Sequence, residues 1–255
     1  MNPSSLTEQD SVFLARVVDA AKICSLRSVP KYIGFIDERQ ALLAARQLDS
    51  IGFKNYCFRG GYDDAKRVFL CILPDYMSAE EHDRYPVFCC YFRFRDCDKL
   101  SHRDFLGSLL ALGVKRETIG DILVKEGEAV VFTTEPVSQM ILSDVSKIGR
   151  VGVRVSCEFV EPFPFVQEFE ASDGTVSSLR LDCITAFITN LSREKSSALI
   201  TAKNVSINHF ECTDVSKNVS VGDIISIRGY GRYILHEVGS ITRKGRIKIT
   251  VKKYK

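Results

Sequence analysis

One stretch, residues 180–208, limits the possible folds most, because it encodes two short helices with almost no connector. Its sequence is RLDCITAFITNLSREKSSALITAKNVSIN. Apolar residues recur at helical spacing in its first part, which predicts an amphipathic helix with one buried stripe. These residues are Leu181, Ile184, Ile188 and Leu191. Ser192 then offers an N-cap oxygen, and we expect a second helix over residues 193–202.

The charge at the start of this second helix is unusual. Arg193 and Lys195 occupy its first turn, where unpaired backbone N–H groups already create a positive potential that disfavours cations. A bound phosphate would offset this cost, because free N–H groups and basic side chains together bind phosphate. The alternative, two solvated side chains on a helix surface, stays open for this fragment taken alone.

The residues that follow predict a small sheet with a basic outer surface. VSIN alternates as a half-buried strand does, and it is followed by VSVGDIISIRGYGRY. There Ile225 and Ile227 can face inward, while Ser226 and Arg228 face outward. The final segment, RKGRIKITVKKYK, places apolar and basic side chains on opposite faces of a strand. The apolar ones are Ile247, Ile249 and Val251.

These pieces together resemble the S4-type RNA-binding domain, named after the fourth protein of the small ribosomal subunit. The match lies in the order RLD, SREKS, an apolar turn, VSIN and VGDIISIRG, and it covers residues 180–232. The resemblance implies that the helix begun by Ser-Arg and the strand after it form an RNA-binding face. The family usually has Gly in the turn after the second helix, where this chain has Ala202-Lys203-Asn204. Asn tolerates the left-handed conformation that such a turn needs.

We therefore predict that Arg193, Lys195 and the N–H groups after Ser192 clamp backbone phosphates of a structured RNA. Other polar and basic residues would line the same face, and Asp182 would orient Arg180 or cap the first helix. Such a face reads shape and phosphate positions more than base edges. The predicted RNA-binding residues are Arg180, Ser192, Arg193, Lys195, Ser196, Lys203, Asn208, Arg228, Arg232, Arg243 and Lys244.

The charge of the chain is divided unevenly. Residues 179–255 hold 14 Lys and Arg against 6 Asp and Glu, a balance of +8, whereas the remainder holds 21 against 26, a balance of −5. Such asymmetry is expected when one module contacts a polyanion and the rest does something else. A length of 255 residues also indicates two or three small domains rather than one. We place the S4-type domain at residues 179–255.

The N-terminal part predicts an α/β region over residues 1–80. Helices are expected over residues 6–26 and 38–48, and strands over residues 54–58 and 67–73. The loop between these strands, RGGYDD, lacks the Gly-Lys-Ser/Thr of a nucleotide-binding loop, so we interpret it as a hairpin turn. The segment LPDYMSAEEHDRYP, with two prolines and a charge cluster, is the expected boundary to the next domain.

Residues 84–165 predict a split βαβ sheet with helices on one face, an RRM-like or ferredoxin-like domain. Strands are expected over residues 87–95, 128–133 and 152–160, and helices over residues 104–112, 118–122 and 137–146. The aromatic signature for base stacking is missing. Tyr91, Phe92 and Phe94 could stack on bases, although core packing is the better interpretation for at least two of them. The fold class expected for the whole chain is α+β.

The stretch LSHRDFLGSLLALGVKRETIGDI, residues 100–122, is also compatible with a helix-turn-helix that has Gly113 in its turn. Its second helix would be very short and its basic residues fall in the turn, which disfavours sequence-specific DNA binding. Four residues here are candidates for secondary RNA contacts instead. They are His102, Arg103, Lys115 and Arg116.

Together with FRGGYDDAKR and the S4-type segment, this stretch resembles the YlmH family of bacterial RNA-binding proteins over essentially the full chain. The resemblance implies an N-terminal region, an RNA-recognition-like middle domain and a C-terminal S4-type domain. It also implies association with rRNA and tRNA on the large ribosomal subunit, including stalled subunits in quality control, and a historical link to cell-division gene clusters. We therefore expect a cytoplasmic, monomeric protein that binds structured RNA.

No catalytic residue is expected, and an RNA-modifying enzyme is the alternative. RLD lacks the preceding His of the HRLD-like motif of pseudouridine synthases, and no GxGxxG follows a strand. The histidines are far apart in sequence and have no evident Cys, Ser or acid partner for nucleophilic catalysis. They are His82, His102, His209 and His236. We expect no cofactor and no small-molecule substrate.

Metal binding and membrane insertion are not expected either. The nine cysteines include no CxxC pair, which favours reduced thiols over a zinc site. No segment approaches the roughly 20 apolar residues of a membrane-crossing helix. The first residues, MNPSSLTEQD, lack the basic and apolar regions of a signal peptide.

Overall fold

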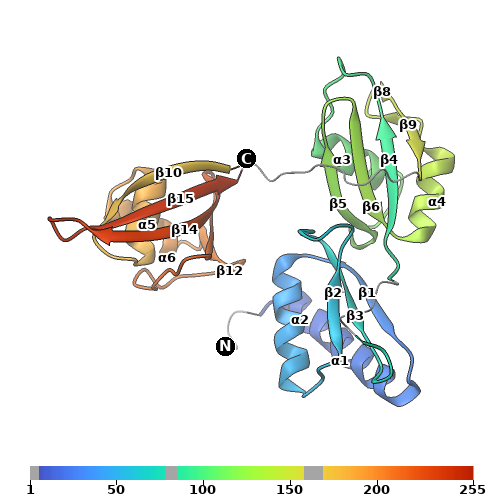
Figure 1. The fold of residues 1–255 in the computed structure, drawn as a ribbon, viewed down its shortest axis with the longest axis horizontal. Coiled ribbons are helices and arrows are strands. Elements are labelled where there is room, and N and C mark those ends of the chain that lie inside the picture. Colours follow the sequence, from blue (N-terminus) through green and yellow to red (C-terminus); the bar gives the residue numbers. More distant parts are fainter. Residues whose placement is uncertain (1–5, 79–84, 158–168, 255) are drawn as a thin grey trace. The chain divides into compact units, whose positions relative to one another are not determined.

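The protein divides into two compact units, which we describe separately. The computed structural model describes residues 6–78, 85–157 and 169–254. The N-terminal unit spans residues 6–165 and the C-terminal unit spans residues 166–255. Both combine helices with antiparallel sheets, so the chain has a mixed fold of helices and sheets, as expected (Figure 1).

The first half of the N-terminal unit packs two helices against a three-stranded antiparallel sheet. Its elements are α1 (Glu8–Arg27), β1 (Lys31–Ile36), α2 (Glu38–Ser50), β2 (Tyr56–Arg59) and β3 (Val68–Ile72), with the strands in the order β1-β3-β2. Both helices begin with a capping box, at Thr7 and Asp37. The two predicted helices and the β2-β3 hairpin are confirmed. β1 was not predicted because it buries side chains on both faces and therefore lacks polar and apolar alternation.

The second half of the N-terminal unit has the element order βαββαβ. Its elements are β4 (Phe88–Arg93), α3 (His102–Ala111), the 3₁₀-helix η2 (Arg116–Thr118), β5 (Ile119–Val124), β6 (Glu128–Thr133), α4 (Glu135–Asp144) and β9 (Arg154–Ser156). The strands form an antiparallel sheet in the order β5-β6-β4-β9. A small hairpin of β7 (Lys147–Ile148) and β8 (Val151–Gly152) precedes β9.

The helix predicted over residues 118–122 is wrong. Only η2 is helical, and the chain then continues as β5, in which Ile122 pairs with Val131 of β6. Pairing with a buried neighbouring strand outweighs the local helical pattern in this segment. The correction also removes the second helix of the alternative helix-turn-helix, so that these residues cannot form a recognition helix.

The two halves of the N-terminal unit share one hydrophobic cluster, which we call the joint core. The first half supplies Phe35, Phe69, Cys71 and Leu73, and the second half supplies Tyr91, Leu123, Val130 and Phe132. Hydrogen bonds cross the same junction, for example from the Lys66 backbone N–H to Asp121 Oδ2 at 2.6 Å. The predicted boundary segment therefore connects two sheets that bury side chains against each other; its residues 79–84 lie outside the described ranges.

The C-terminal unit packs two helices on one face of a six-stranded antiparallel sheet (Figure 1). Its elements are β10 (Phe169–Val176), α5 (Leu181–Thr189), α6 (Arg193–Thr201), β11 (Val205–Ile207), β12 (Phe210–Glu211), β13 (Ile224–Ile227), β14 (Gly231–Ile241) and β15 (Ile247–Tyr254). The strand order is β10-β15-β14-β13-β11-β12. Both predicted helices are confirmed. β10 was not predicted, and the unit therefore begins earlier than residue 179.

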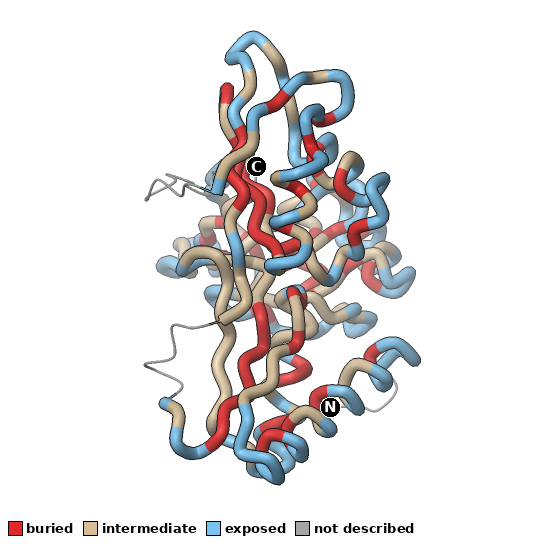
Figure 2. The backbone as a smooth tube through the Cα atoms, turned by 90° about the vertical axis from the view of Figure 1, so that its right-hand side faces the viewer, coloured by how far each residue is buried: buried red, intermediate tan, exposed pale blue. Residues whose placement is uncertain are grey.

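Alternating burial fixes which face of this sheet meets the helices. Ile225 and Ile227 are buried in one cluster with Leu181, Ile184 and Ile200 of the two helices. Residues at the intervening positions of β13 consequently face away from the helices. In Figure 2 the buried residues concentrate in the strands and on the inner sides of helices, while the turns are mostly exposed.

The turn after α6 closes differently from the expectation. Lys203, rather than Asn204, adopts the left-handed conformation, with φ 59°. Its backbone N–H and that of Asn204 donate to the carbonyls of Ile200 and Leu199, both at 3.0 Å. The tight turn thus forms without the usual glycine, at the small cost that this conformation has for a residue with a side chain.

Candidate nucleic-acid interface

The start of α6 has the predicted capped and basic geometry. Ser192 Oγ accepts a hydrogen bond from the backbone N–H of Lys195 at 3.3 Å. The side chains of Ser192, Arg193 and Lys195 are all exposed. Because the first amides of a helix lack intrahelical acceptors, an anion that approaches this end meets N–H donors and two cationic side chains together.

A buried carboxylate holds two of the predicted arginines. Asp182, 3% exposed, accepts from Arg193 Nη2 at 2.6 Å and from Arg180 Nε at 3.1 Å. Burial alone would raise the pKa of Asp182, but the hydrogen bonds from Arg193 and Arg180 outweigh it and leave the pKa below its ordinary value. The prediction that Asp182 orients Arg180 is confirmed. The side chain of Arg193 is thus exposed to solvent while Asp182 holds its guanidinium in place.

Arg193 also lines a cavity of about 280 Å³ together with Arg246. Arg246 is fixed by two hydrogen bonds to Thr175, from Nε to Oγ1 at 2.9 Å and from Nη2 to the carbonyl at 2.6 Å. Two anchored guanidiniums on one cavity suit a phosphate, which accepts several charged hydrogen bonds at once. Arg246 is absent from the predicted set because its anchor lies on the unpredicted strand β10.

Of three other predicted residues, Lys203 is accessible, Asn208 has a structural role and Ser196 is inaccessible. Lys203 is exposed and lies 4.0 Å from Glu211, a surface ion pair that contributes little to stability. Asn208 uses both ends of its amide within the fold, donating to Asp223 Oδ1 at 2.7 Å and accepting from the Ile224 N–H at 2.9 Å. Ser196 is fully buried, so the prediction that its side chain contacts RNA is wrong.

Arg228 and Arg232 do not share a face with the start of α6, which corrects the single face expected from the sequence. Both occupy outward positions, since Arg232 pairs with Ser226 across β13 and β14 while Ile225 and Ile227 face the helices. Arg228 is exposed, and Arg232 is half-buried. Arg243 and Lys244 are exposed in the turn between β14 and β15.

The outward face around Arg232 carries aromatic rings interleaved with cations. The Arg232 guanidinium lies 4.9 Å from the ring centroid of Tyr254, whose ring is 4.9 Å from that of Phe169. Lys252 Nζ lies 5.9 Å from the Phe169 ring. Rings and cations of this kind suit unpaired bases. The pairing of β10 with β15 that brings Phe169 here could not be predicted from local sequence.

The predicted secondary contacts lie in the N-terminal unit. His102 and Arg103 are exposed at the start of α3, and Lys115 is exposed just before η2. Although the His102 side chain is exposed to solvent, the protein atoms around its imidazole desolvate it, and this desolvation and the charge of Arg116 lower its pKa, which favours the neutral form. Arg116 is half-buried and donates to the Ile119 carbonyl at 2.6 Å.

The three aromatic residues that were considered for base stacking all contribute to the hydrophobic clusters of the N-terminal unit. Tyr91 and Phe92 are buried, as the core interpretation predicted, and Phe94 packs against the same cluster as Phe92. The hydroxyl of Tyr91 donates to the carboxylate of Glu128.

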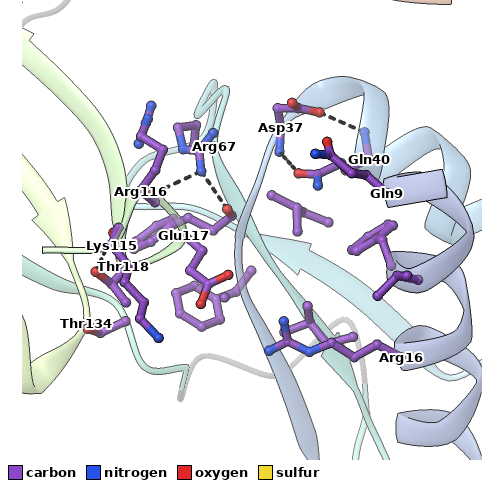
Figure 3. A pocket seen from close by; sticks show the side chains of 17 residues that line it. Gln9, Arg16, Asp37, Gln40, Arg67, Lys115, Arg116, Glu117, Thr118 and Thr134 are labelled. Carbon is purple, nitrogen blue, oxygen red and sulfur yellow. Dashed lines mark hydrogen bonds between the residues drawn. The ribbon is translucent and has the colours of Figure 1, made fainter. Parts of the chain in front are cut away.

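Lys115 and Arg116 also border a hollow of about 1000 Å³ within the N-terminal unit. Its other wall includes Arg16 of α1, and Figure 3 shows the side chains of Arg16 and Lys115 reaching into the hollow from opposite walls. Among the described residues, no group of three or more His, Cys, Asp or Glu side chains is arranged to hold a metal ion. Within those same ranges, no helix has the length and apolar content that a membrane crossing requires.

Comparison with known proteins places the chain in a family. Residues 93–161 match the family model described as "Putative RNA-binding domain in YlmH". The "Ribosome-associated protein quality control protein P2" of Bacillus subtilis (strain 168) is 30% identical over 257 residues, which cover 97% of this chain and 96% of the relative. The chain belongs to the YlmH family. Lys115 and Arg116 of this YlmH-family chain lie within the matched model.

A match to a solved structure covers part of the chain. It is that of "Cell division protein ylmH from Streptococcus pneumoniae", with a TM-score of 0.49 and 22% sequence identity. The match covers 59% of this YlmH-family chain and 92% of the other chain.

Proposed function

We propose that this chain is a non-enzymatic RNA-binding protein whose C-terminal unit grips the phosphates of a structured RNA, either rRNA or tRNA. The observation that carries the proposal is the cavity between Arg193 and Arg246 at the start of α6, with Lys195 exposed nearby. Both arginines are held by the protein, so little side-chain freedom is lost when a phosphate binds.

The domain assignment that accompanies this function is S4-type for residues 179–255, joined by β10. It is supported by the succession of two short helices and antiparallel strands that the resemblance implies. We assign an RRM-like domain to residues 84–165, supported by the βαββαβ order and the strand order β5-β6-β4-β9. Residues 1–80 form the remaining α/β region.

The proposed setting is the large ribosomal subunit in the cytoplasm, where a monomer acts in translation or in ribosome-associated quality control. This is supported by the name of the Bacillus subtilis relative and by its coverage of nearly the whole chain. The charge of +8 in residues 179–255 directs that unit toward a polyanion.

Co-sedimentation with ribosomal subunits at a series of salt concentrations tests the grip. If about five phosphates are neutralised, the logarithm of the binding constant falls against the logarithm of the salt concentration with a slope of about −4. The variant Arg193→Gln/Lys195→Gln removes two cations without placing a carboxylate beside Asp182. We expect it to weaken binding and to make the slope less negative by about 2.

The matched control is Lys22→Gln/Arg27→Gln, which removes one lysine and one arginine from the exposed surface of α1. Circular dichroism establishes that both variants keep their fold. Equal co-sedimentation of the α6 variant and the α1 control would refute the proposed grip.

The absence of catalysis has its own test. An RNA-modifying enzyme leaves an altered nucleoside, which mass spectrometry of RNA from cells with and without the gene detects. We expect identical nucleoside profiles. The aspartate of RLD is bound by two arginines, which makes it a positioning group for those side chains.

A further inference from the structure

The hollow of about 1000 Å³ in the N-terminal unit has two unlike walls. One wall comes from α1 and β1 and includes Val12, Phe13 and Arg16. The opposite wall comes from the segment around η2 and includes Lys115 and Arg116. A space of this size accommodates a small organic ligand, since such sites measure about 300–1,000 Å³.

Arg67 and Arg116 are two half-buried, positively charged side chains in the lining of this hollow. Arg67 donates to the carbonyls of Phe35 at 2.7 Å and Ile119 at 2.9 Å, and Arg116 donates to the Ile119 carbonyl as well. Among the ion pairs of the described residues, none includes either arginine. Burial, together with the neighbouring Arg116, lowers the pKa of Arg67 to about 10.

The two carboxylates that interact electrostatically with this arginine pair also accept hydrogen bonds from backbone N–H groups. Asp37 accepts from the backbone N–H of Gln40 at 2.8 Å as the cap of α2, and Asp121 accepts from that of Lys66 at 2.6 Å. The lining of the hollow therefore holds four basic side chains against two acidic ones, Asp37 and Glu117. Asp37 and Asp121 stabilise the charges of both arginines electrostatically, but neither forms an ion pair with them within the described residues. Two half-buried guanidiniums of this kind are costly, and an anion from outside the protein would offset part of that cost.

The wall from α1 adds an apolar surface. Val12 is 69% exposed, and Phe13 is only partly buried beside it. Arg16 lies one helical turn after these two residues, and it reaches toward Lys115 across the hollow (Figure 3). A ligand that interacts with both the cations and the apolar side chains of this hollow has an anionic part and a flat or apolar part.

We propose that this hollow binds a nucleotide, with its phosphate on the cations Lys115, Arg116 and Arg16 and its base against Phe13 and Val12. A phosphate accepts several charged hydrogen bonds, and a base stacks on apolar and aromatic side chains. The nucleotide belongs either to an unpaired position of an RNA strand or to a free mononucleotide. The site is separate from the grip on α6 and uses Arg16 and Phe13, which lie outside the matched family model.

Isothermal titration calorimetry on the full-length chain tests the proposal. The probes are adenosine 5′-monophosphate, uridine 5′-monophosphate, a short single-stranded RNA and inorganic triphosphate. Each titration is repeated in the Arg193→Gln/Lys195→Gln background, which reduces the contribution of the proposed grip on α6. A failure of the α6 grip is thereby distinguished from a failure of the nucleotide site.

The decisive variant is Arg16→Glu/Lys115→Glu, because both side chains are exposed and neither supports the fold through a hydrogen bond from its side chain within the described residues. We expect it to weaken nucleotide binding about tenfold or more, since hydrogen bonds to charged groups are lost from both walls. The control Lys22→Glu/Arg27→Glu makes the same change of charge on α1 away from the hollow, and its affinity should be unchanged.

The probes identify the source of the nucleotide. Mononucleotides that bind as tightly as the short RNA indicate a free nucleotide, and tighter binding of the RNA indicates an unpaired nucleotide of a strand. The proposal is overturned if no nucleotide probe binds, or if the decisive variant and its control behave alike. It is also overturned if inorganic triphosphate binds as tightly as any nucleotide, because the hollow would then be a simple anion patch.

Discussion

At the scale of single residues, a buried aspartate joins the first two helices. Asp10, 5% exposed, completes the capping box of α1 by accepting from the Thr7 backbone N–H at 2.8 Å. The same carboxylate receives two hydrogen bonds from Arg39 of α2, the longer at 2.7 Å. One side chain therefore satisfies the end of one helix and fixes the position of the next.

The variant Asp10→Asn should destabilise the N-terminal unit by about 3 kcal/mol, because it removes one partner of a largely buried ion pair. The hydrogen bond from Arg39 lowers the pKa of Asp10 from its ordinary value of 3.8. A group whose pKa is lowered by folding stabilises the native state above its unfolded pKa, and this contribution is lost as the pH falls further.

Urea unfolding of the wild type and the variant, at pH values from 7 down to about 3, measures both effects. The difference in unfolding free energy should be full at pH 7 and should shrink below about pH 4. An equal difference at every pH would show that Asp10 does not act through its charge.

At the scale of elements, the turn between β2 and β3 packs directly on the second half of the N-terminal unit. A Cβ atom at Gly61 would lie 2.0 Å from the ring of Phe132, which is 3% exposed. Phe132 belongs to β6 and to the joint core. Glycine is therefore required in this hairpin loop because the loop packs closely against Phe132 of another sheet, and not because the loop binds a phosphate.

The variant Gly61→Ala should destabilise the N-terminal unit by about 1–3 kcal/mol, because the buried ring has to move. Gly107→Ala is the matched control. Gly107 lies within α3, and its added methyl group would meet nothing within 4 Å. That control should stabilise the protein by about 0.5–1 kcal/mol through helix propensity. Thermal unfolding measures both, and a shift of the same sign in both variants would contradict the packing argument.

The elements that could be predicted from sequence are those with a local pattern. α5 and α6 follow from the spacing of Leu181 and Ile184 and from the cap at Ser192, all within a few residues. β10 is polar over most of its length, and its partner β15 lies far along the chain, so no local period reveals it. For the same reason, Arg193 was predicted as a site residue, whereas Arg246 was missed.

The hollow in the N-terminal unit could not be predicted from the sequence either, because its walls come from segments far apart in the chain. Lys115 and Arg116 were singled out by their position in a turn, but Arg16 looked like an ordinary charged residue on a helix surface. Only the packing of the two halves brings α1 opposite η2.

At the scale of the whole molecule, the chain divides into two compact units, and the first of them contains both N-terminal segments that the sequence analysis treated separately. The joint core explains why the two halves form one unit, because each half supplies large buried side chains to it, such as Phe35 from the first half and Phe132 from the second. Neither half would bury these side chains alone. Each of the two units has a complete hydrophobic cluster of its own.

Fragments test this organisation. Residues 6–165 and 166–255 should each unfold cooperatively in calorimetry, and the second fragment should keep the salt-dependent affinity for RNA. Residues 6–78 alone should fail to fold cooperatively, because the joint core would face water. A cooperative transition for residues 6–78 would contradict the role given to the joint core.

Asp182 has one more consequence for the surface above it. Asp182 forms ion pairs with Arg180 and Arg193 of the same chain, so it competes intramolecularly with any anion that approaches these two side chains. Its effective concentration does not fall on dilution, so a chloride or a lone phosphate ion gains little by displacing it. A polyanion contacts several cations at once, so it can bind the arginines while their ion pairs with Asp182 remain. The buried carboxylate thereby favours the binding of long polyanions over that of small anions in solution.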